Sequence, residues 1–185
     1  PGIYTLTTTE IHGQIVCSST KSFDIVLSNP ATITSIETKD WTTSENIIQI
    51  AASGLGNYEY SLDNINFQDS NLFTNLPSGE YTVYVRDKNG CGTIDQEVYL
   101  LMYPFFFTPN GDGINDKWKI KFSEVEPNLS IKIFDRHGKF IKQLGANSEG
   151  WDGTFVGNNL PSSDYWFVVT RENGKEYRGH FSLKR

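Results

Sequence analysis

The sequence predicts an all-β protein built from tandem β-sandwiches, the last of them a small C-terminal one. Aromatic residues make up 14% of the chain, and its 16 glycines are accompanied by frequent Asn, Asp, Ser and Thr. This composition is typical of short strands joined by tight turns. No stretch shows the i, i+3, i+4, i+7 apolar spacing of an amphipathic helix. No apolar run approaches the ~20 residues that a membrane-spanning helix needs.

An internal repeat organises the first hundred residues. Residues 2–6 are echoed by residues 79–83, and Cys17 is echoed by Cys91. The period of roughly 75 residues fits one Ig-like β-sandwich per repeat. We therefore expect residues 1–28 to be the C-terminal hairpin of an upstream repeat and residues 29–101 to be a complete Ig-like repeat. The cysteines would then occupy equivalent positions in successive repeats, so we expect them not to pair.

Strand positions in the repeat follow from alternation and from turn residues. We expect strands near residues 32–38, 47–51, 58–62, 81–86 and 93–100. Asn89-Gly90 is the hairpin turn between the last two, because these residues adopt positive φ at little cost.

Residues 102–185 form a third region with a pattern of its own. Residues 117–122 alternate Lys with Trp or an apolar side chain, which predicts a strand with one buried and one cationic face. Residues 129–133 and 139–144 flank a turn at residues 135–138. Residues 165–170 and 177–183 flank the turn Asn173-Gly174. We expect these strands to form a small sandwich.

The charge distribution also separates the regions. Residues 1–101 carry a balance of −8 and residues 102–185 a balance of +2, which suggests two modules with different surroundings. Neither part is basic enough to indicate nucleic-acid binding. His12, His137 and His180 lie in three different places, and no nucleophile or phosphate-binding motif occurs. We therefore expect the protein not to be an enzyme and to need no cofactor.

The C-terminal region resembles a known family in several consecutive motifs. Residues 107–118 read Phe-Thr-Pro-Asn-Gly-Asp-Gly-Ile-Asn-Asp-Lys-Trp, and residues 150–153 read Gly-Trp-Asp-Gly. Together with residues 131–138 and 179–184, they resemble the type B C-terminal sorting domain of the type IX secretion system, the gliding-motility-associated C-terminal domain of Bacteroidota. One departure is Ser163-Asp164, where the family commonly has Gly. Residues 58–91 are similar, more loosely, to the repeats of SprB-like surface adhesins.

The resemblance implies a route and a destination. The C-terminal domain would be read by the type IX translocon, pass through the periplasm and be held at the outer membrane by a PorP/SprF-type barrel protein. The chain opens Pro-Gly-Ile-Tyr, without Met or signal peptide, so we expect it to be the tail of a longer adhesin. We expect no transmembrane segment of its own.

Two loops are the candidate recognition surface, because rigid loops on a scaffold often carry binding residues. Their residues are Thr108, Pro109, Asn110, Gly111, Asp112, Gly113, Asn115 and Asp116 in one loop and Trp151, Asp152 and Gly153 in the other. The alternative is that the first loop only shapes a turn and pins Trp118 into the core.

Two further hypotheses concern ligands. Asn110, Asp112 and Asp116 could hold Ca²⁺ through side-chain oxygens, although the chain lacks the distal Glu of an EF-hand loop; the alternative is Asx-turn hydrogen bonding. Tyr165, Trp166 and Trp151 could form a sugar-stacking platform, which would make the domain a carbohydrate-binding or adhesive module. The competing interpretation places these rings in the core.

Overall fold

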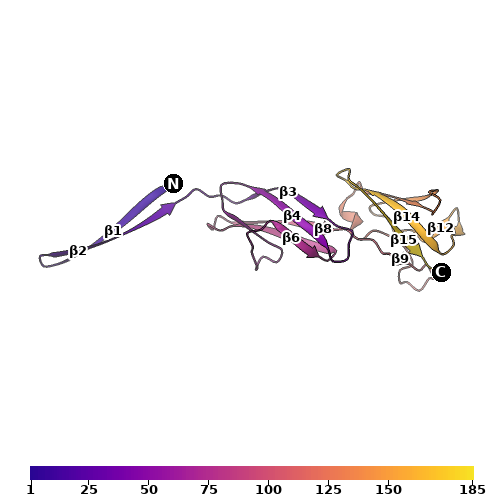
Figure 1. The fold of residues 1–185 in the computed structure, drawn as a ribbon, viewed down its shortest axis with the longest axis horizontal. Coiled ribbons are helices and arrows are strands. Elements are labelled where there is room, and N and C mark those ends of the chain that lie inside the picture. Colours follow the sequence, from indigo (N-terminus) through magenta and orange to yellow (C-terminus); the bar gives the residue numbers. More distant parts are fainter. The chain divides into compact units, whose positions relative to one another are not determined.

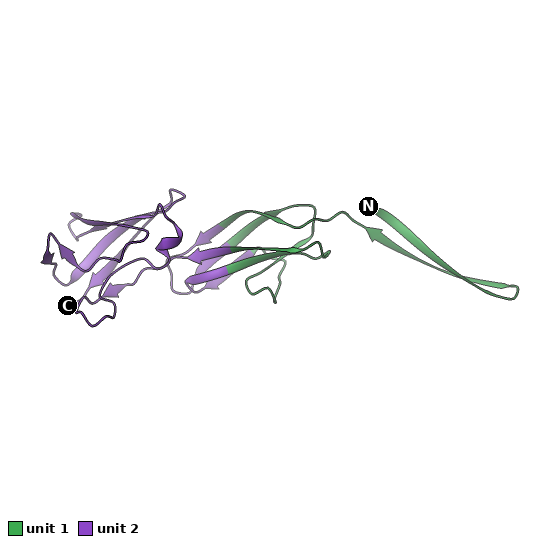
Figure 2. Cartoon of the chain, turned by 180° about the vertical axis from the view of Figure 1, so that it is seen from behind, with its two compact units in different colours: residues 1–36, 49–71, 82–96 green, residues 37–48, 72–81, 97–185 purple.

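The computed structural model describes all residues from 1 to 185 and confirms the all-β prediction. It contains fifteen strands and one short 3-10 helix, Ser123–Val125, and no α-helix. No helix in it is long and apolar enough to cross a bilayer. Spatial contacts divide the chain into two compact units, shown in Figure 2. One comprises residues 1–36, 49–71 and 82–96, and the other comprises residues 37–48, 72–81 and 97–185.

The first strands form the expected hairpin. β1 (Gly2–His12) pairs with β2 (Ile15–Ile25) in an unbroken antiparallel register, and Gly13 provides the positive φ of the turn. Tyr4 and Phe23 are cross-strand partners with stacked rings. Every residue of both strands is exposed, including the large apolar ones. The hairpin is drawn in indigo in Figure 1.

The repeat contains two three-stranded sheets. One has the order β3-β4-β6 and the other the order β5-β7-β8. The strands are β3 (Thr32–Lys39), β4 (Asn46–Ser53), β5 (Tyr58–Ser61), β6 (Leu72–Leu76), β7 (Gly79–Asp87) and β8 (Thr93–Leu100). Five of these lie where alternation predicts them, and β6 was not predicted. Val83 and Val85 of β7 are fully buried.

The C-terminal module is built on a five-stranded sheet with the order β11-β10-β14-β15-β9. Its strands are β9 (Phe106–Phe107), β10 (Ser130–Phe134), β11 (Phe140–Gly145), β14 (Ser163–Thr170) and β15 (Glu176–Leu183). Residues 154–155 and 158–159 form the small hairpin β12–β13. β9 pairs parallel to β15, and the other neighbours are antiparallel. The turns at residues 135–138 and 173–174 connect β10 to β11 and β14 to β15, as predicted.

The prediction of a strand at residues 117–122 is wrong, but the predicted alternation of buried and exposed side chains in this segment is confirmed. Trp118 and Ile120 are fully buried and Lys119 and Lys121 are exposed. The segment makes only two isolated bridges, Trp118 to Trp151 and Lys121 to Met102. Its extended course ends because Phe122 takes a left-handed conformation with φ 63° at the start of the 3-10 helix.

Two tryptophans from loops complete the core of this module. The Trp118 ring stacks on Phe181 of β15 with centroids 3.9 Å apart, and the Trp151 ring meets Tyr165 of β14 edge-on at 4.9 Å. Both indole N–H groups donate to carbonyl oxygens, of Pro104 and Thr154 respectively. Their backbones exchange two hydrogen bonds of 2.8 Å. The core therefore fixes the ends of both loops proposed for recognition.

The second compact unit also holds residues that lie before the predicted boundary at residue 102. Trp41 is almost fully buried in the core of the C-terminal module and stacks on Tyr177, with centroids 4.5 Å apart and an interplanar angle of 10°. Leu101 is fully buried in the same core, and its carbonyl oxygen accepts a hydrogen bond from the Trp41 N–H. The folding unit that carries the C-terminal sheet thus includes side chains from the repeat.

A charged triad lies beside this stack. The Arg171 guanidinium donates to Asp40 at 2.7 Å and twice to Glu126, through Nε at 2.8 Å and through Nη2. The side chain of Asp40 is only 3% exposed and that of Arg171 is 13% exposed. Burial raises the pKa of Asp40, and the adjacent positive charge of Arg171 opposes that rise. Because moving a charge from water into the protein interior is costly, the buried Asp40 carboxylate needs the positive charge of Arg171 to offset its lost hydration.

Candidate recognition loop

The signature loop, residues 108–116, follows β9 and ends two residues before Trp118, which is buried in the core. Its ends are tied by a 2.8 Å hydrogen bond from the Thr108 N–H to the Asn115 carbonyl oxygen. The residues from Asn110 to Asn115 are all exposed, whereas Thr108, Pro109 and Asp116 are half-buried. The loop therefore projects a closed, polar tip from a fixed base, as expected for a recognition element.

Asp116 organises the inside of this tip. One carboxylate oxygen accepts the Gly111 N–H at 2.7 Å and the other accepts the Gly113 N–H at 2.8 Å. Both glycines have positive φ, which lets their N–H groups turn toward the carboxylate. The hydrogen bonds from Gly111 and Gly113 lower the pKa of Asp116, so the charged form holds the loop together.

The proposed calcium ligands are engaged with the loop itself. Asp112 accepts the Ile114 N–H at 2.7 Å and the Asn110 side-chain N–H at 2.8 Å, and its own N–H donates to the Asn110 side-chain oxygen. All four carboxylate oxygens of Asp112 and Asp116 therefore accept hydrogen bonds. No group of three or more His, Cys, Asp or Glu side chains is placed to hold a metal ion. The geometry follows the Asx-turn alternative.

We expect Asp116→Asn to loosen the loop without unfolding the module. An amide has one acceptor oxygen, so one of the two glycine N–H groups would face an NH₂ donor instead. Hydrogen exchange measured by NMR should then become faster at Gly111 and Gly113, while the unfolding midpoint changes little because the loop is exposed. Asp95→Asn, an equal charge change on β8, is the control and should leave both glycines unchanged.

The same contact predicts a pH dependence. The folded pKa of Asp116 lies below its unfolded value of about 3.9. Its contribution is therefore complete above that value and is lost as the pH falls through the lowered folded pKa. Protection of Gly111 and Gly113 should decline in acid in the wild-type protein and should be flat with pH in the Asn variant. Equal protection in both proteins at every pH would contradict this role of Asp116.

The second predicted loop is mostly internal, which corrects its proposed role. Trp151 and Gly153 are buried, and only Asp152 is exposed. A side chain on Gly153 would meet Leu183 at 2.6 Å, and φ there is +79°, so glycine is required for close packing against β15. Asp152 accepts the N–H and the hydroxyl of Thr154. Trp151 and Gly153 therefore support the core and are not presented to a partner.

The predicted sugar-stacking platform is also corrected in part. Tyr165 and Trp151 are at most 2% exposed, because both point into the core from the inner side of the sheet and the facing loop. Trp166 is 42% exposed and points to the opposite face of β14. The three rings thus do not form one surface.

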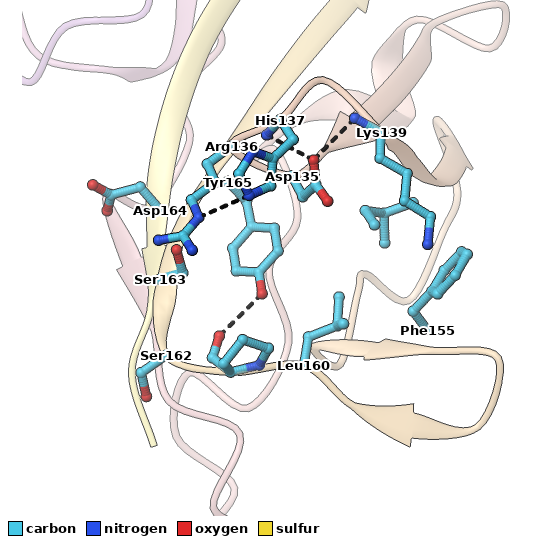
Figure 3. Close-up of a pocket in the computed structure, with 12 residues that line it drawn as sticks. Asp135, Arg136, His137, Lys139, Phe155, Leu160, Ser162, Ser163, Asp164 and Tyr165 are labelled. Carbon is cyan, nitrogen blue, oxygen red and sulfur yellow. Dashed lines mark hydrogen bonds between the residues drawn. The ribbon is translucent and has the colours of Figure 1, made fainter.

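A pocket that the sequence did not reveal lies between the β10–β11 turn and the start of β14 (Figure 3). It measures about 310 Å³. Arg136 and His137 lie on one side and Leu160 on another, and the Lys139 ammonium group lies 4.6 Å from the centre of the Phe155 ring. The Tyr165 hydroxyl donates to the Pro161 carbonyl oxygen at 3.0 Å, and Asp135 accepts the N–H groups of His137 and Lys139. Asp135 and His137 are thus hydrogen-bonded to groups beside them in the turn.

Comparison with protein families identifies this module. Residues 100–183 match the family model described as the CHU_C type IX secretion signal domain. The C-terminal module is a type IX secretion signal domain. A signal domain of this family directs its protein to the type IX secretion system and so to the cell surface. The matched range contains the whole signature loop, both core tryptophans and the five-stranded sheet.

Other comparisons say less about the signal domain. No curated protein matches the chain. Among solved structures, the chain is 11% identical to Tp47, the 47-kilodalton lipoprotein of Treponema pallidum, with a TM-score of 0.30, covering 88% of this chain and 53% of that one. It is 13% identical to dimeric latent PorU from Porphyromonas gingivalis, with a TM-score of 0.28, covering 83% of this chain and 20% of that one. The chain thus spans about half or less of the length of these structures.

Proposed function

We propose that this chain is the C-terminal part of a bacterial surface adhesin whose signal domain also holds it at the outer membrane. The match of residues 100–183 to the signal-domain family is the observation that carries the proposal. A hairpin and a β-sandwich repeat precede the signal domain in the chain, and we propose that they belong to the stalk of the adhesin. The similarity to SprB-like repeats adds gliding motility as the process that the adhesin serves.

The proposed partners are the translocon during export and a PorP/SprF-type barrel protein afterwards. We propose that their contact is on the exposed tip of the signature loop, Asn110 to Asn115, and on Asp152, the exposed residue of the second loop. The tip is rigid before binding, because Asp116 and Asp112 already order its backbone, and a preorganised loop loses little entropy on binding. The role is one of address and attachment rather than catalysis.

The proposal is tested by fusing residues 1–185 behind a signal peptide and a fluorescent reporter in a Bacteroidota host. We expect the reporter to reach the surface, measured by its loss to external protease in intact cells. In a host that lacks the translocon the reporter should stay in the periplasm. Deleting the barrel-protein gene should release the reporter to the medium, because that protein is proposed to hold the chain after export.

Two shorter fusions sharpen the result. Residues 1–101 should remain periplasmic in every host, because they lack the signal domain. The fusion of residues 102–185 should still be exported, because it contains the sorting signal. It lacks Asp40 and Trp41, which pair with Arg171 and pack in the core of the domain, so we expect a less stable domain and less reporter at the surface. Surface exposure of the 1–101 fusion, or full periplasmic retention of the 1–185 fusion, would contradict the proposal.

A further inference from the structure

The outer face of the signal-domain sheet carries a row of aromatic rings that runs across four neighbouring strands. Phe140 of β11 is the cross-strand partner of Phe134 of β10, and Phe134 is the partner of Trp166 of β14. Trp166 is in turn the partner of His180 of β15. Directly paired residues lie on the same face of a sheet. The four rings therefore form one continuous line across the strands.

This row faces away from the core. Phe140 is 48% and Trp166 42% exposed, His180 is exposed and Phe134 is half-buried. Their neighbours along each strand, such as Ile133, Phe167 and Phe181, are buried on the other side. The core is complete without these rings, so their exposure is not a consequence of packing. Exposed aromatic groups that gather in this way mark an interaction surface.

Cationic and hydrogen-bonding groups flank the row on both sides. On one side, the register places Lys132, Val168 and Arg178 in the next line across the sheet. On the other side, Ser182 is the partner of Phe106, whose ring lies 4.3 Å from the Lys184 ammonium group. Lys132 makes no ion pair. The carboxylates on this face are engaged: Asp164 accepts the Ser182 hydroxyl, and Glu176 pairs with Arg178.

From this arrangement we propose that the outer sheet face binds an anionic polysaccharide, a chain of sugar rings bearing carboxylate or phosphate groups. The apolar faces of pyranose rings stack on aromatic side chains, and the hydroxyl groups of the sugar can form hydrogen bonds with the polar side chains that flank the row. Across three strand spacings of about 4.8 Å the row extends about 14 Å, enough for a short oligosaccharide. The row lies on a regular pleated sheet, so successive sugar rings can contact neighbouring side chains along it. Lys132 and Lys184 at its flanks make no ion pair and complement negative charge, whereas Arg178 is paired with Glu176.

The binding surface is distinct from the signature loop, so the inference does not depend on the proposed export. Trp166, Phe134 and His180 lie on strands of the sheet, and none of them lines the pocket of Figure 3. This row shares only Trp166 with the sugar-stacking platform expected from the sequence. Its other rings are brought together by the register of the strands, which the sequence alone does not show.

The test uses the whole chain of 185 residues, with alginate as the anionic probe and dextran as the neutral one. Affinity is measured by calorimetry and by retardation in native gels. We expect wild-type protein to bind alginate and not dextran. Trp166→Ala should weaken alginate binding at least about tenfold, equivalent to about 1.4 kcal/mol. Phe140→Ala should weaken binding too, and Lys132→Gln should lower affinity and reduce its salt dependence.

Phe105→Ala is the matched control, because Phe105 is an exposed ring of the same domain outside the row, and it should bind as wild type. Equal alginate binding by wild-type and Trp166→Ala protein would assign the interaction to charge alone and overturn the proposal. Equal binding of dextran, or no binding of alginate by wild type, would also overturn it. So would loss of cell-surface attachment in Trp166→Ala cells without any alginate binding in vitro, which would assign the face to a protein partner.

Discussion

Arg171→Met is expected to lower the free energy of unfolding by about 3–5 kcal/mol. The substitution keeps the packing of the aliphatic stem but leaves the Asp40 carboxylate, which is 3% exposed, without its cation. It also removes three hydrogen bonds, one to Asp40 and two to Glu126. Denaturant unfolding of the whole chain, followed by tryptophan fluorescence, measures the loss.

The pH dependence of this variant distinguishes the charge from the packing. Burial already raises the pKa of Asp40, and removing Arg171 removes an influence that lowers it. A carboxyl group whose folded pKa is raised costs stability above that pKa, and the cost disappears as the pH falls through it. The deficit of Arg171→Met should therefore shrink in acid.

A second variant provides the control for the triad. The triple variant Asp40→Leu, Glu126→Leu, Arg171→Met has no buried charge, and it should recover most of the lost stability. A triple variant as unstable as Arg171→Met would contradict the account, because the loss would then come from packing rather than from an unpaired carboxylate.

Trp118→Ala should destabilise the signal domain by about 3–5 kcal/mol. Trp118 is fully buried, stacks on Phe181 and contacts Phe167, so its removal leaves a large cavity. The indole also donates to the Pro104 carbonyl oxygen, which would lose its partner. Differential scanning calorimetry should show a lower melting temperature.

Trp166→Ala is the matched control for this prediction. It removes the same type of side chain from the same domain, but Trp166 is on the exposed face of the sheet, so the melting temperature of this variant should change much less. Equal shifts for the two variants would show that Trp118 does not carry the core as the structure indicates.

The parts of the fold that could be predicted are those in which neighbouring residues of the sequence alternate between polar and apolar or form a recognisable turn. β15 alternates polar and apolar residues, and Phe181 and Leu183 are buried as that alternation requires. Residues 165–169 of β14 are all aromatic or apolar, so the pattern could not tell that Tyr165 faces the core and Trp166 faces solvent. Register with β10 and β15 decides it.

Other features depend on contacts between distant residues. Asp40 and Arg171 are 131 positions apart, and no local pattern relates them. Residues 117–122 have the alternation of a strand, but β9 already occupies the edge of the sheet beside β15, and the segment pairs only at single positions with loops. Trp151 looked available in its loop because a sequence does not show that the bridge to Trp118 draws it inward.

The candidate site was predicted in part. The Asn, Asp and Gly residues of the signature loop predict both a loop at this position and Asx-turn hydrogen bonding within it, because these residue types have specific roles in turns. Which residues of the two predicted recognition loops are exposed and which are buried could not be predicted. The tip from Asn110 to Asn115 is exposed, whereas Gly153 is packed against Leu183.

We propose that the type IX machinery reads the exposed tip of the signature loop. A photo-crosslinking amino acid placed at Ile114, which is 68% exposed, tests this contact, and the same group at Val156, which is 81% exposed in the β12–β13 turn, is the control. In living cells that export the full chain, Ile114 should crosslink to a translocon or outer-membrane barrel component, and Val156 should not. Absence of any crosslink from Ile114, with export intact, would contradict the claim.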